Sequence, residues 1–302
     1  MSYIYYPGCS LKGLGRAYEE SLLAVFDALN VGLKELPDWN CCGATAYMAI
    51  DESRAFVLSA RNLALAEKHS GGAETVHMIA PCSGCYLVLA KTQRYMEEFK
   101  EIGEEVTAAL DAANLHYEGN VQIRHPLDVL VNDIGLDIIA SHVKQPLTGL
   151  RVACYYGCQL VRPYATFDDQ HQPTAMERLM RALGAEVVDW PLKTRCCGGS
   201  LTGTIQDVGL RLNYILLKES KKRGADVLAT ACPLCQFNLE CYQSRISRRF
   251  KEEVRMPVTY FTQILGKALG IDDRVLGMQR LFVPMRPLRA AESVEGGQYA
   301  LR

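Results

Sequence analysis

The sequence predicts an α/β protein built from two pseudo-symmetric βαβ (Rossmann-like) halves, each with a parallel sheet and one cysteine-rich site. Three observations predict it: an internal repeat, an alternation of strand-like with helix-like segments, and a cysteine pattern that occurs twice. Each copy is a lone cysteine, then Cys-Cys-Gly, then Cys-x-x-Cys, and the two copies use ten of the twelve cysteines. They are Cys9, Cys41, Cys42, Cys82 and Cys85, followed by Cys158, Cys196, Cys197, Cys232 and Cys235.

The sequence around these cysteines repeats in the same order, which is the mark of a duplicated unit. The corresponding segments are 5–11 with 155–160, Asp38-Trp39 with Asp189-Trp190, 75–81 with 226–231, and 123–130 with 258–265. The repeat predicts two domains, residues 1–146 and 147–283. The remaining tail, 284–302, contains Pro287 and Gly296-Gly297 without periodicity and is predicted to be an extended arm or disordered.

Strand-like and helix-like segments alternate within each half. In the first half we predict strands at 3–6 and 75–80, and helices at 17–29, 54–69 and 86–99, the last with a continuation to 113 left open. In the second half we predict strands at 151–155, 186–189 and 226–230, and helices at 175–183, 208–223 and 236–250. Such alternation is typical of right-handed βαβ units on parallel sheets.

Composition and charge exclude several classes of protein. Hydrophobic residues make up 49% and charged residues 22%, as in an ordinary globular protein, and the net charge of −1 gives no basic field for nucleic acid. The longest apolar stretches, such as 227–231, are too short for a transmembrane segment. No leader-like segment opens the chain, so we predict a cytoplasmic location, with attachment to a membrane through partners left open.

The cysteine pattern predicts metal binding, because gathered thiolates are ligands for soft metals and iron–sulfur clusters. Five thiolates per copy are one more than an ordinary four-thiolate site uses. Cys82 and Cys232 each follow a strand and begin a helix, where free N–H groups favour thiolate. Adjacent cysteines on an extended chain point to opposite faces. The glycines that follow them, Gly43 and Gly198-Gly199, allow the turn that brings both to one centre.

Two alternatives stay open at this point. Four thiolates also make a closed zinc site, so one half could hold zinc while the other holds iron. In the second half both Cys154 and Cys158 could be the lone ligand. Only Cys158 shares the Tyr-Tyr-Gly-Cys context of Cys9, so we interpret Cys158 as the ligand and Cys154 as a buried spectator. Cys241 is interpreted as structural.

Several other residues near the pattern have simpler structural interpretations. Three basic residues close to the second set of ligands could hold a substrate anion, but a solvated face is the favoured interpretation. The tryptophans are interpreted as core anchors and the histidines as ordinary core or surface residues. The basic residues are Arg162, Lys193 and Arg195, the tryptophans are Trp39 and Trp190, and the histidines are His125 and His171.

The doubled pattern resembles the cysteine-rich domain repeated in the B subunit of heterodisulfide reductase and its bacterial relatives. The resemblance covers residues 1–283 and is carried by Tyr5–Cys9, Trp39–Ala44 and Cys154–Cys158. It implies that the five cysteines of each half hold one noncubane [4Fe-4S] cluster, and that a heterodisulfide is cleaved between the two. It also implies two partners in the same complex, a ferredoxin-like iron–sulfur protein and a flavin-bearing protein.

The resemblance has one departure, at Gln159. Methanogen members tend to have histidine after this lone cysteine, and glutamine cannot replace it as an acid. Either another group donates protons or the substrate differs. The function predicted is therefore an iron–sulfur catalytic subunit that cleaves or forms a disulfide or related sulfur substrate, exchanging electrons with partner subunits. The alternative is an electron-relay subunit of a sulfur-oxidising, succinate or lactate/glycolate oxidoreductase complex.

Overall fold

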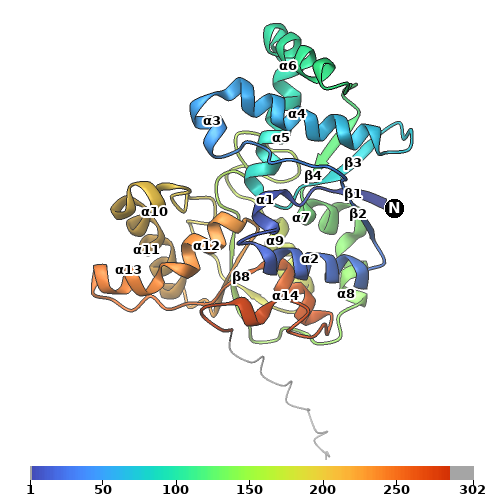
Figure 1. Cartoon of the computed structure of the whole chain (residues 1–302). Coiled ribbons are helices and arrows are strands. Elements are labelled where there is room, and N and C mark those ends of the chain that lie inside the picture. The colour runs from blue at the N-terminus through green and yellow to red at the C-terminus, as the bar shows by residue number, and fades with distance from the viewer. Residues whose placement is uncertain (1, 286–302) are drawn as a thin grey trace, which may run out of the picture.

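The computed structural model describes residues 2–285, and its two halves repeat one order of elements (Figure 1). The first half contains β1 (Ser2–Tyr5), α1 (Gly8–Leu11), α2 (Arg16–Ala28), β2 (Gly32–Glu35), α3 (Ala46–Ile50), α4 (Glu52–Lys68), β3 (Val76–Ile79), α5 (Ser83–Glu98), α6 (Lys100–Ala112), β4 (Val121–Arg124), α7 (Pro126–Asp128), the π-helix η1 (Val129–Gly135) and α8 (Leu136–Ser141). The second contains β5 (Arg151–Tyr155), α9 (Ala175–Ala182), β6 (Glu186–Val187), α10 (Leu201–Thr204), α11 (Gln206–Lys222), β7 (Val227–Thr230), α12 (Pro233–Cys241), α13 (Gln243–Phe250), β8 (Val258–Tyr260), α14 (Phe261–Ala268) and the 3₁₀ turn η2 (Met278–Arg280).

Two four-stranded sheets with the same strand order form the framework. The first runs β2-β1-β3-β4 and the second β6-β5-β7-β8, and every neighbouring pair is parallel. The predicted α/β fold with two pseudo-symmetric halves is therefore confirmed. In both sheets the strand that leads to Cys-x-x-Cys, β3 or β7, lies between the first strand of its half and an edge strand.

Some predicted elements differ from those observed. The predicted continuation of α5 is a separate helix, α6, because the backbone of Phe99 is extended and interrupts the helix between α5 and α6. The single helix predicted over 236–250 begins earlier, at Pro233, and is interrupted at Tyr242. The short strands β2, β4 and β8 were not predicted as strands. Each spans only three or four residues, which is too few for an alternation of apolar and polar residues to stand out.

The two halves share a core rather than lying apart. One cluster of buried side chains contains residues of both halves, and a second lies behind the second set of cysteines. At the junction the rings of Tyr18 and Tyr260 are stacked, with centroids 4.5 Å apart. The hydroxyls of Ser21 and Thr262 are 2.6 Å apart in the same contact between α2 and α14. The division at residue 146 stays a prediction, because the halves pack as one body.

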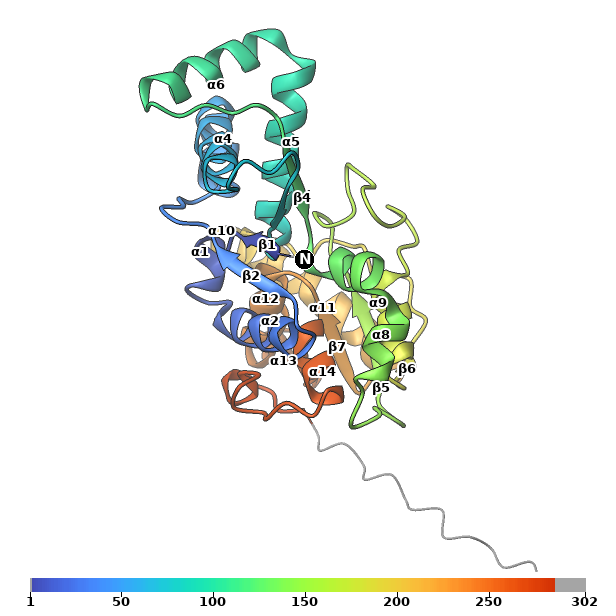
Figure 2. The ribbon, with the colours of Figure 1, turned by 90° about the vertical axis from the view of Figure 1, so that its right-hand side faces the viewer.

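One group of helices from each half extends away from the shared core. Figures 1 and 2 show α4, α5 and α6 standing away from the body of the molecule at the top. Helices α10, α11 and α13 gather at the left in Figure 1, while α1 and α12 meet near the centre. No helix within residues 2–285 is both long and apolar enough to cross a membrane. The predicted tail lies outside the described residues from 286 onward.

The chain after η2 is attached to α12 by a buried carboxyl group. An oxygen of Glu240 accepts the backbone N–H groups of Phe282 and Val283, at 2.9 and 3.2 Å. Its other oxygen accepts from the amide of Gln236. Burial raises the pKa of Glu240 from its ordinary value of 4.5 to about 7, against the lowering effect of these hydrogen bonds.

The raised pKa of Glu240 predicts that the stability of the fold depends on pH. The unfolded chain releases the proton near pH 4.5 and the folded chain near pH 7, so the free energy of unfolding falls as the pH rises between these values. The difference corresponds to about 3 kcal/mol at most. We expect urea unfolding of Glu240→Gln to show a flatter profile between pH 4.5 and 7 than the unmodified chain. An unchanged profile would mean that Glu240 titrates normally.

Candidate functional site

All ten cysteines of the doubled pattern line one cavity of about 310 Å³ between the two halves. The sequence predicted one pocket for each half, and the structure instead joins the two sets of thiols around a common space. All ten are free thiols. Cys9, Cys41 and Cys196 are exposed and Cys158 is half-buried, whereas the other six are buried. The cavity therefore opens to solvent beside the lone and first paired cysteines, and closes over the Cys-x-x-Cys pairs.

Local structure places the cysteines as the sequence predicts. Cys82 and Cys232 are the N-cap residues of α5 and α12, so both Cys-x-x-Cys pairs lie at the start of a helix. The glycines after the paired cysteines have positive φ values, +81° at Gly43, +98° at Gly198 and +53° at Gly199. These turns allow both members of each pair to reach the cavity, which an extended chain would prevent.

Thiol contacts run through each set in the same way. In the first half the sulfurs of Cys9 and Cys41 are 3.9 Å apart, and those of Cys42 and Cys85 are 3.1 Å apart. In the second half Cys197 lies 3.5 Å from Cys235. The backbone N–H of Gly198 also donates to the sulfur of Cys196, at 3.2 Å. The two halves thus repeat the contact between the second paired cysteine and the end of Cys-x-x-Cys.

The two sets meet at Cys82 and Cys232. A hydrogen bond from the Cys232 thiol, followed by one from Cys85, holds the pKa of Cys82 well below its usual range despite burial. Hydrogen bonds from Cys42 and then Cys9 lower the pKa of Cys41 to about 2. Hydrogen bonds from the neighbouring thiols lower that of Cys196 to about 2 in the same way. In both halves the pKa of the first paired cysteine is thus lowered by neighbouring thiols, and in the first half the pKa of Cys82 is lowered as well.

The donor set consists of thiols, which are ligands for soft metals and iron–sulfur clusters. Two thiolates bound to the same metal lie roughly 3.8 Å apart when each bond is about 2.3 Å in tetrahedral geometry. The contact between Cys9 and Cys41 matches that separation. The sulfurs form a connected series around the cavity, as bridging and terminal ligands of a cluster require.

Two glycines leave the space that such a group needs. A Cβ atom at Gly8 would lie 3.0 Å from the sulfur of Cys85, and one at Gly157 would lie 3.1 Å from the sulfur of Cys235. Both glycines have positive φ and each precedes the lone cysteine of its half. In both repeats a glycine thus lies beside the sulfur of the last cysteine of Cys-x-x-Cys. Any larger residue there would place a side-chain carbon against that sulfur.

The spectator Cys154, the structural Cys241 and the three basic residues near the second set of ligands lie outside the cavity. Cys154 is fully buried in β5, where its carbonyl accepts the indole N–H of Trp190 at 2.8 Å. Cys241 lies at the end of α12 and does not line the cavity. Lys193 pairs with Glu177 at 3.0 Å. Arg162 donates to the carbonyl of Thr194. Neither these two side chains nor Arg195 line the cavity.

The aromatic residues and histidines have structural contacts. Trp39 packs edge-on against Tyr6, with ring centroids 5.9 Å apart. His125 is buried, and its ring contacts the carbonyl of Pro81 at 3.1 Å while accepting the N–H of Leu127. Burial lowers the pKa of His125 to about 4, so the ring is neutral. His171 is exposed in the loop before α9. None of these lines the cavity.

The rest of the cavity lining is uncharged and contains both polar and apolar side chains. No Asp, Glu, Lys, Arg or His of the described residues lines it. Gln159 lies at the junction, where its side-chain oxygen is 3.3 Å from the position of a Cβ on Gly84 of the other half. The sequence prediction did not include the other members, although their position next to the cysteines could have indicated them. They are Ser10, Ala44, Thr45, Ser83, Tyr156, Ser200 and Leu234.

The fold and the site define a class: proteins with two cysteine-rich α/β modules that join their thiols in one cavity. The chain belongs to the CCG cysteine-rich domain family, whose sequence model matches residues 3–90 and 152–240. These two matches cover both sets of cysteines, and the predicted resemblance is confirmed.

Two of the relatives that match over most of their length are named as subunits of reductases. The chain is 31% identical over 278 residues to the 8-methylmenaquinol:fumarate reductase membrane anchor subunit of Wolinella succinogenes, covering 91% of this chain and 95% of that protein. It is 27% identical over 278 residues to the B subunit of the ferredoxin:CoB-CoM heterodisulfide reductase of Methanosarcina mazei, covering 90% and 91%. A protein of Archaeoglobus profundus named as similar to the B subunit of heterodisulfide reductase is 28% identical over 286 residues, covering 92% and 94%.

One solved structure shows the same fold. The crystal structure of a hypothetical protein from Helicobacter pylori matches with a TM-score of 0.75 at 15% sequence identity. The match covers 94% of this chain and 52% of that protein, so this chain spans about half its length. At this level of identity the likeness concerns the fold alone.

Proposed function

We propose that the chain is the iron–sulfur catalytic subunit of a heterodisulfide-reductase-like complex and acts on a disulfide or a related sulfur substrate. The observation that carries the proposal is that both sets of five thiols open into one cavity. A substrate with two sulfur atoms can meet both sets there, whereas two centres that only relay electrons have no need of a shared space. The resemblance to the B subunit of heterodisulfide reductase over nine-tenths of the chain supports the same conclusion.

The cysteines of each half would hold one [4Fe-4S] cluster, noncubane in form, and such clusters supply single electrons. Cleavage of a disulfide consumes two electrons and two protons and gives two thiols. The apolar side chains of Ala44 and Leu234 would exclude water from the substrate, and the hydroxyls of Ser10 and Thr45 would offer hydrogen bonds. Because no carboxyl or imidazole group lines the cavity within residues 2–285, we expect protons to come from water at the opening.

The proposed partners are a ferredoxin-like iron–sulfur protein and a flavin-bearing protein, both subunits of the same complex. Two electrons are needed for each turnover, and among the described residues the thiol cavity is the candidate redox site. The names of the similar proteins support assembly, since each is a subunit of a larger reductase. We propose that electrons pass between these partners and the exposed side of the thiol cavity, near Cys9 and Cys196.

A second function is favoured by one specific observation. At 31%, the identity to the fumarate reductase subunit of Wolinella succinogenes exceeds the 27–28% to the heterodisulfide reductase subunits. The chain would then relay electrons within a quinol-linked or similar oxidoreductase complex, and the cavity would hold no substrate. Addition of a disulfide distinguishes the two functions, because only a chain that performs the catalysis binds it at the thiol cavity.

Metal analysis of the anaerobically purified chain is the first test. Two four-iron centres give about eight irons and as much acid-labile sulfide per chain. After oxidation, we expect a small disulfide to induce a new paramagnetic signal if the chain is catalytic and none if it is a relay. Iron without a disulfide-induced signal would support the relay. A colourless protein with about two zinc ions would contradict both, because zinc has no redox chemistry.

A further inference from the structure

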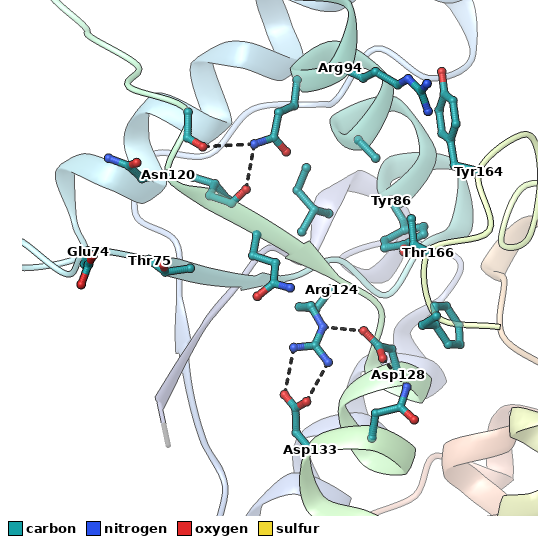
Figure 3. A pocket seen from close by; sticks show the side chains of 18 residues that line it. Glu74, Thr75, Tyr86, Arg94, Asn120, Arg124, Asp128, Asp133, Tyr164 and Thr166 are labelled. Carbon is teal, nitrogen blue, oxygen red and sulfur yellow. Dashed lines mark hydrogen bonds and ion pairs between the residues drawn. The ribbon is translucent and has the colours of Figure 1, made fainter. Parts of the chain in front are cut away.

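A larger cavity than the thiol site lies along the outer edge of the first sheet. It is an open groove of about 820 Å³ between β4, α5 and the loop that carries Tyr164 and Thr166 (Figure 3). The hydroxyls of Tyr86 and Thr166 hydrogen-bond to each other and join the loop to α5. We call this space the β4 groove.

The strand at the floor of the β4 groove is an edge strand of its sheet, and Gln93 occupies the carbonyl of Val121 along it. The N–H groups of Val76 and Ala80 donate to the carbonyls of Asn120 and Arg124, at 2.9 Å each. Because backbone groups alternate in direction along a strand, those of Val121 and Ile123 face away from β3 and into the groove. No second strand within residues 2–285 pairs with β4 on this side. Such an edge is a template for another extended chain.

The second half contains an equivalent groove in the same surroundings. Gln93 and Gln243 are related by the offset of 150 residues that relates Cys82 to Cys232. Gln93 donates to the carbonyl of Val121 at 3.1 Å, and Gln243 donates to that of Met256, the corresponding residue, at 2.7 Å. The position of α5 against β4 is therefore repeated by α12, together with the first residue of α13, against β8.

In the second half this groove is covered by the chain itself. The backbone N–H groups of Phe282 and Val283 are held by Glu240 on α12. A cavity of about 370 Å³ remains, and Val283 and Pro284 line it together with Met256 and Pro257. The residue of α5 that corresponds to Glu240 is Ala90, which lines the β4 groove. Within residues 2–285 the loop of Tyr164 and Thr166 contacts Arg94 and Tyr86 at the rim of the first groove, which is more than twice as large as its counterpart.

We propose that the β4 groove binds an extended segment of a partner subunit, which takes the place that residues 281–284 take in the second half. The proposal rests on the proposed function only in assuming a multi-subunit assembly. Because Ala90 replaces Glu240, the segment's own N–H groups cannot use a carboxylate on α5. They pair instead with the outward carbonyl of Ile123, and the segment's carbonyls pair with the N–H groups of Val121 and Ile123.

The groove also limits the side chains of its partner. A partner residue that lies over the half-buried Ala90 contacts its methyl group and the ring of Tyr86. We therefore expect this partner residue to be apolar. The ionisable lining residues are three carboxylates, of Glu74, Asp128 and Asp133, against two guanidinium groups. Arg124 is already held by Asp128 and Asp133 (Figure 3). The excess of negative charge favours an arginine or lysine in the partner where it passes Glu74.

Hydrogen exchange measured by mass spectrometry tests this pairing. The probe is the assembly purified with its native partner subunits, compared with the chain alone. We expect the amides of Val121 and Ile123 to exchange at least about tenfold more slowly in the assembly, because a backbone hydrogen bond protects them. The corresponding amides of Gln122 and Arg124, which face β3, are expected to be slow in both samples. Disulfide turnover is measured separately, so that a failure of the proposed function does not affect this result.

A variant that fills the groove adds a second readout. We expect Ala90→Trp to weaken assembly with the partner by about tenfold or more, because it overpacks the floor of the groove. Glu97→Trp places the same bulk on an exposed position of α5 outside the groove and is expected to assemble normally. Equal iron content and thermal unfolding of the two variants show that the fold is intact.

Four results would overturn the proposal. Equal exchange of Val121 and Ile123 in both samples would mean that the groove stays open in the assembly. Protection in the isolated chain that is lost after truncation at Met285 would identify residues 286–302 as the occupant. Protection that depends on the concentration of the isolated chain would identify a second copy. A chain that purifies from its native cells without any partner would contradict the assembly that the proposal requires.

Discussion

Replacement of Cys197 by alanine is expected to lower the iron content from about eight to about four per chain and to abolish disulfide turnover. Cys197 is buried and lies 3.5 Å from Cys235, within the second set of thiols. Loss of residues that only orient a metal ligand reduces activity by about 10–100-fold, so loss of a ligand is expected to exceed about 100-fold. Iron and sulfide analysis and turnover of the assembled complex measure the two effects.

The matched control is Cys154→Ala. This thiol is equally buried but lies in β5 and does not line the cavity, so we expect about eight irons and full turnover. Its removal lowers the free energy of unfolding by about 1 kcal/mol through lost packing. If Cys154→Ala lost iron and Cys197→Ala kept it, the assignment of Cys158, Cys196 and Cys197 to one centre would be wrong. If Cys197→Ala kept electron transfer through an ordinary four-thiolate cluster, the relay function would be favoured.

Gly157→Ala is expected to empty the second centre while leaving the first filled, again giving about four irons per chain. The residue has a φ of +70°, which costs a non-glycine residue about 1–2 kcal/mol. Its new Cβ would also lie 3.1 Å from the sulfur of Cys235, closer than ordinary contact. Either Cys235 moves away from Cys197 or the loop of Cys158 shifts, and both changes separate ligands of the same centre.

Gly149→Ala separates these two effects. Gly149 has a similar φ of +77°, but a Cβ there would meet no atom within 4 Å. The control therefore has the backbone strain without the contact with sulfur, and we expect a similar loss of stability with about eight irons retained. Thermal unfolding and iron analysis of both variants are compared. Equal iron content in Gly157→Ala and Gly149→Ala would mean that the space beside Cys235 is not needed for the metal.

The predicted fold is correct where residues close together in the sequence determine the local structure. β5 was predicted with its observed bounds, because Arg151–Tyr155 is a short apolar run next to a recognisable repeat. The turn glycines after Cys42 and Cys197 were recognised because adjacent cysteines cannot both face one site on an extended strand. The edge strands β4 and β8 were missed as strands, although their similarity to each other was seen. Their pairing depends on β3 and β7, which lie far away in the sequence.

The sequence by itself determined the thiols, their grouping into two sets of five, and the helix starts and turns that aim them. These properties depend on residue types and on spacings of a few residues, which the chain carries locally. Only the tertiary structure decided that Cys82 and Cys232 interact, so that both sets open into one cavity. It also decided that one edge groove is covered by residues 281–284 and its counterpart is open. Both outcomes depend on how two similar halves pack together, because contacts between distant segments leave no periodicity in the sequence.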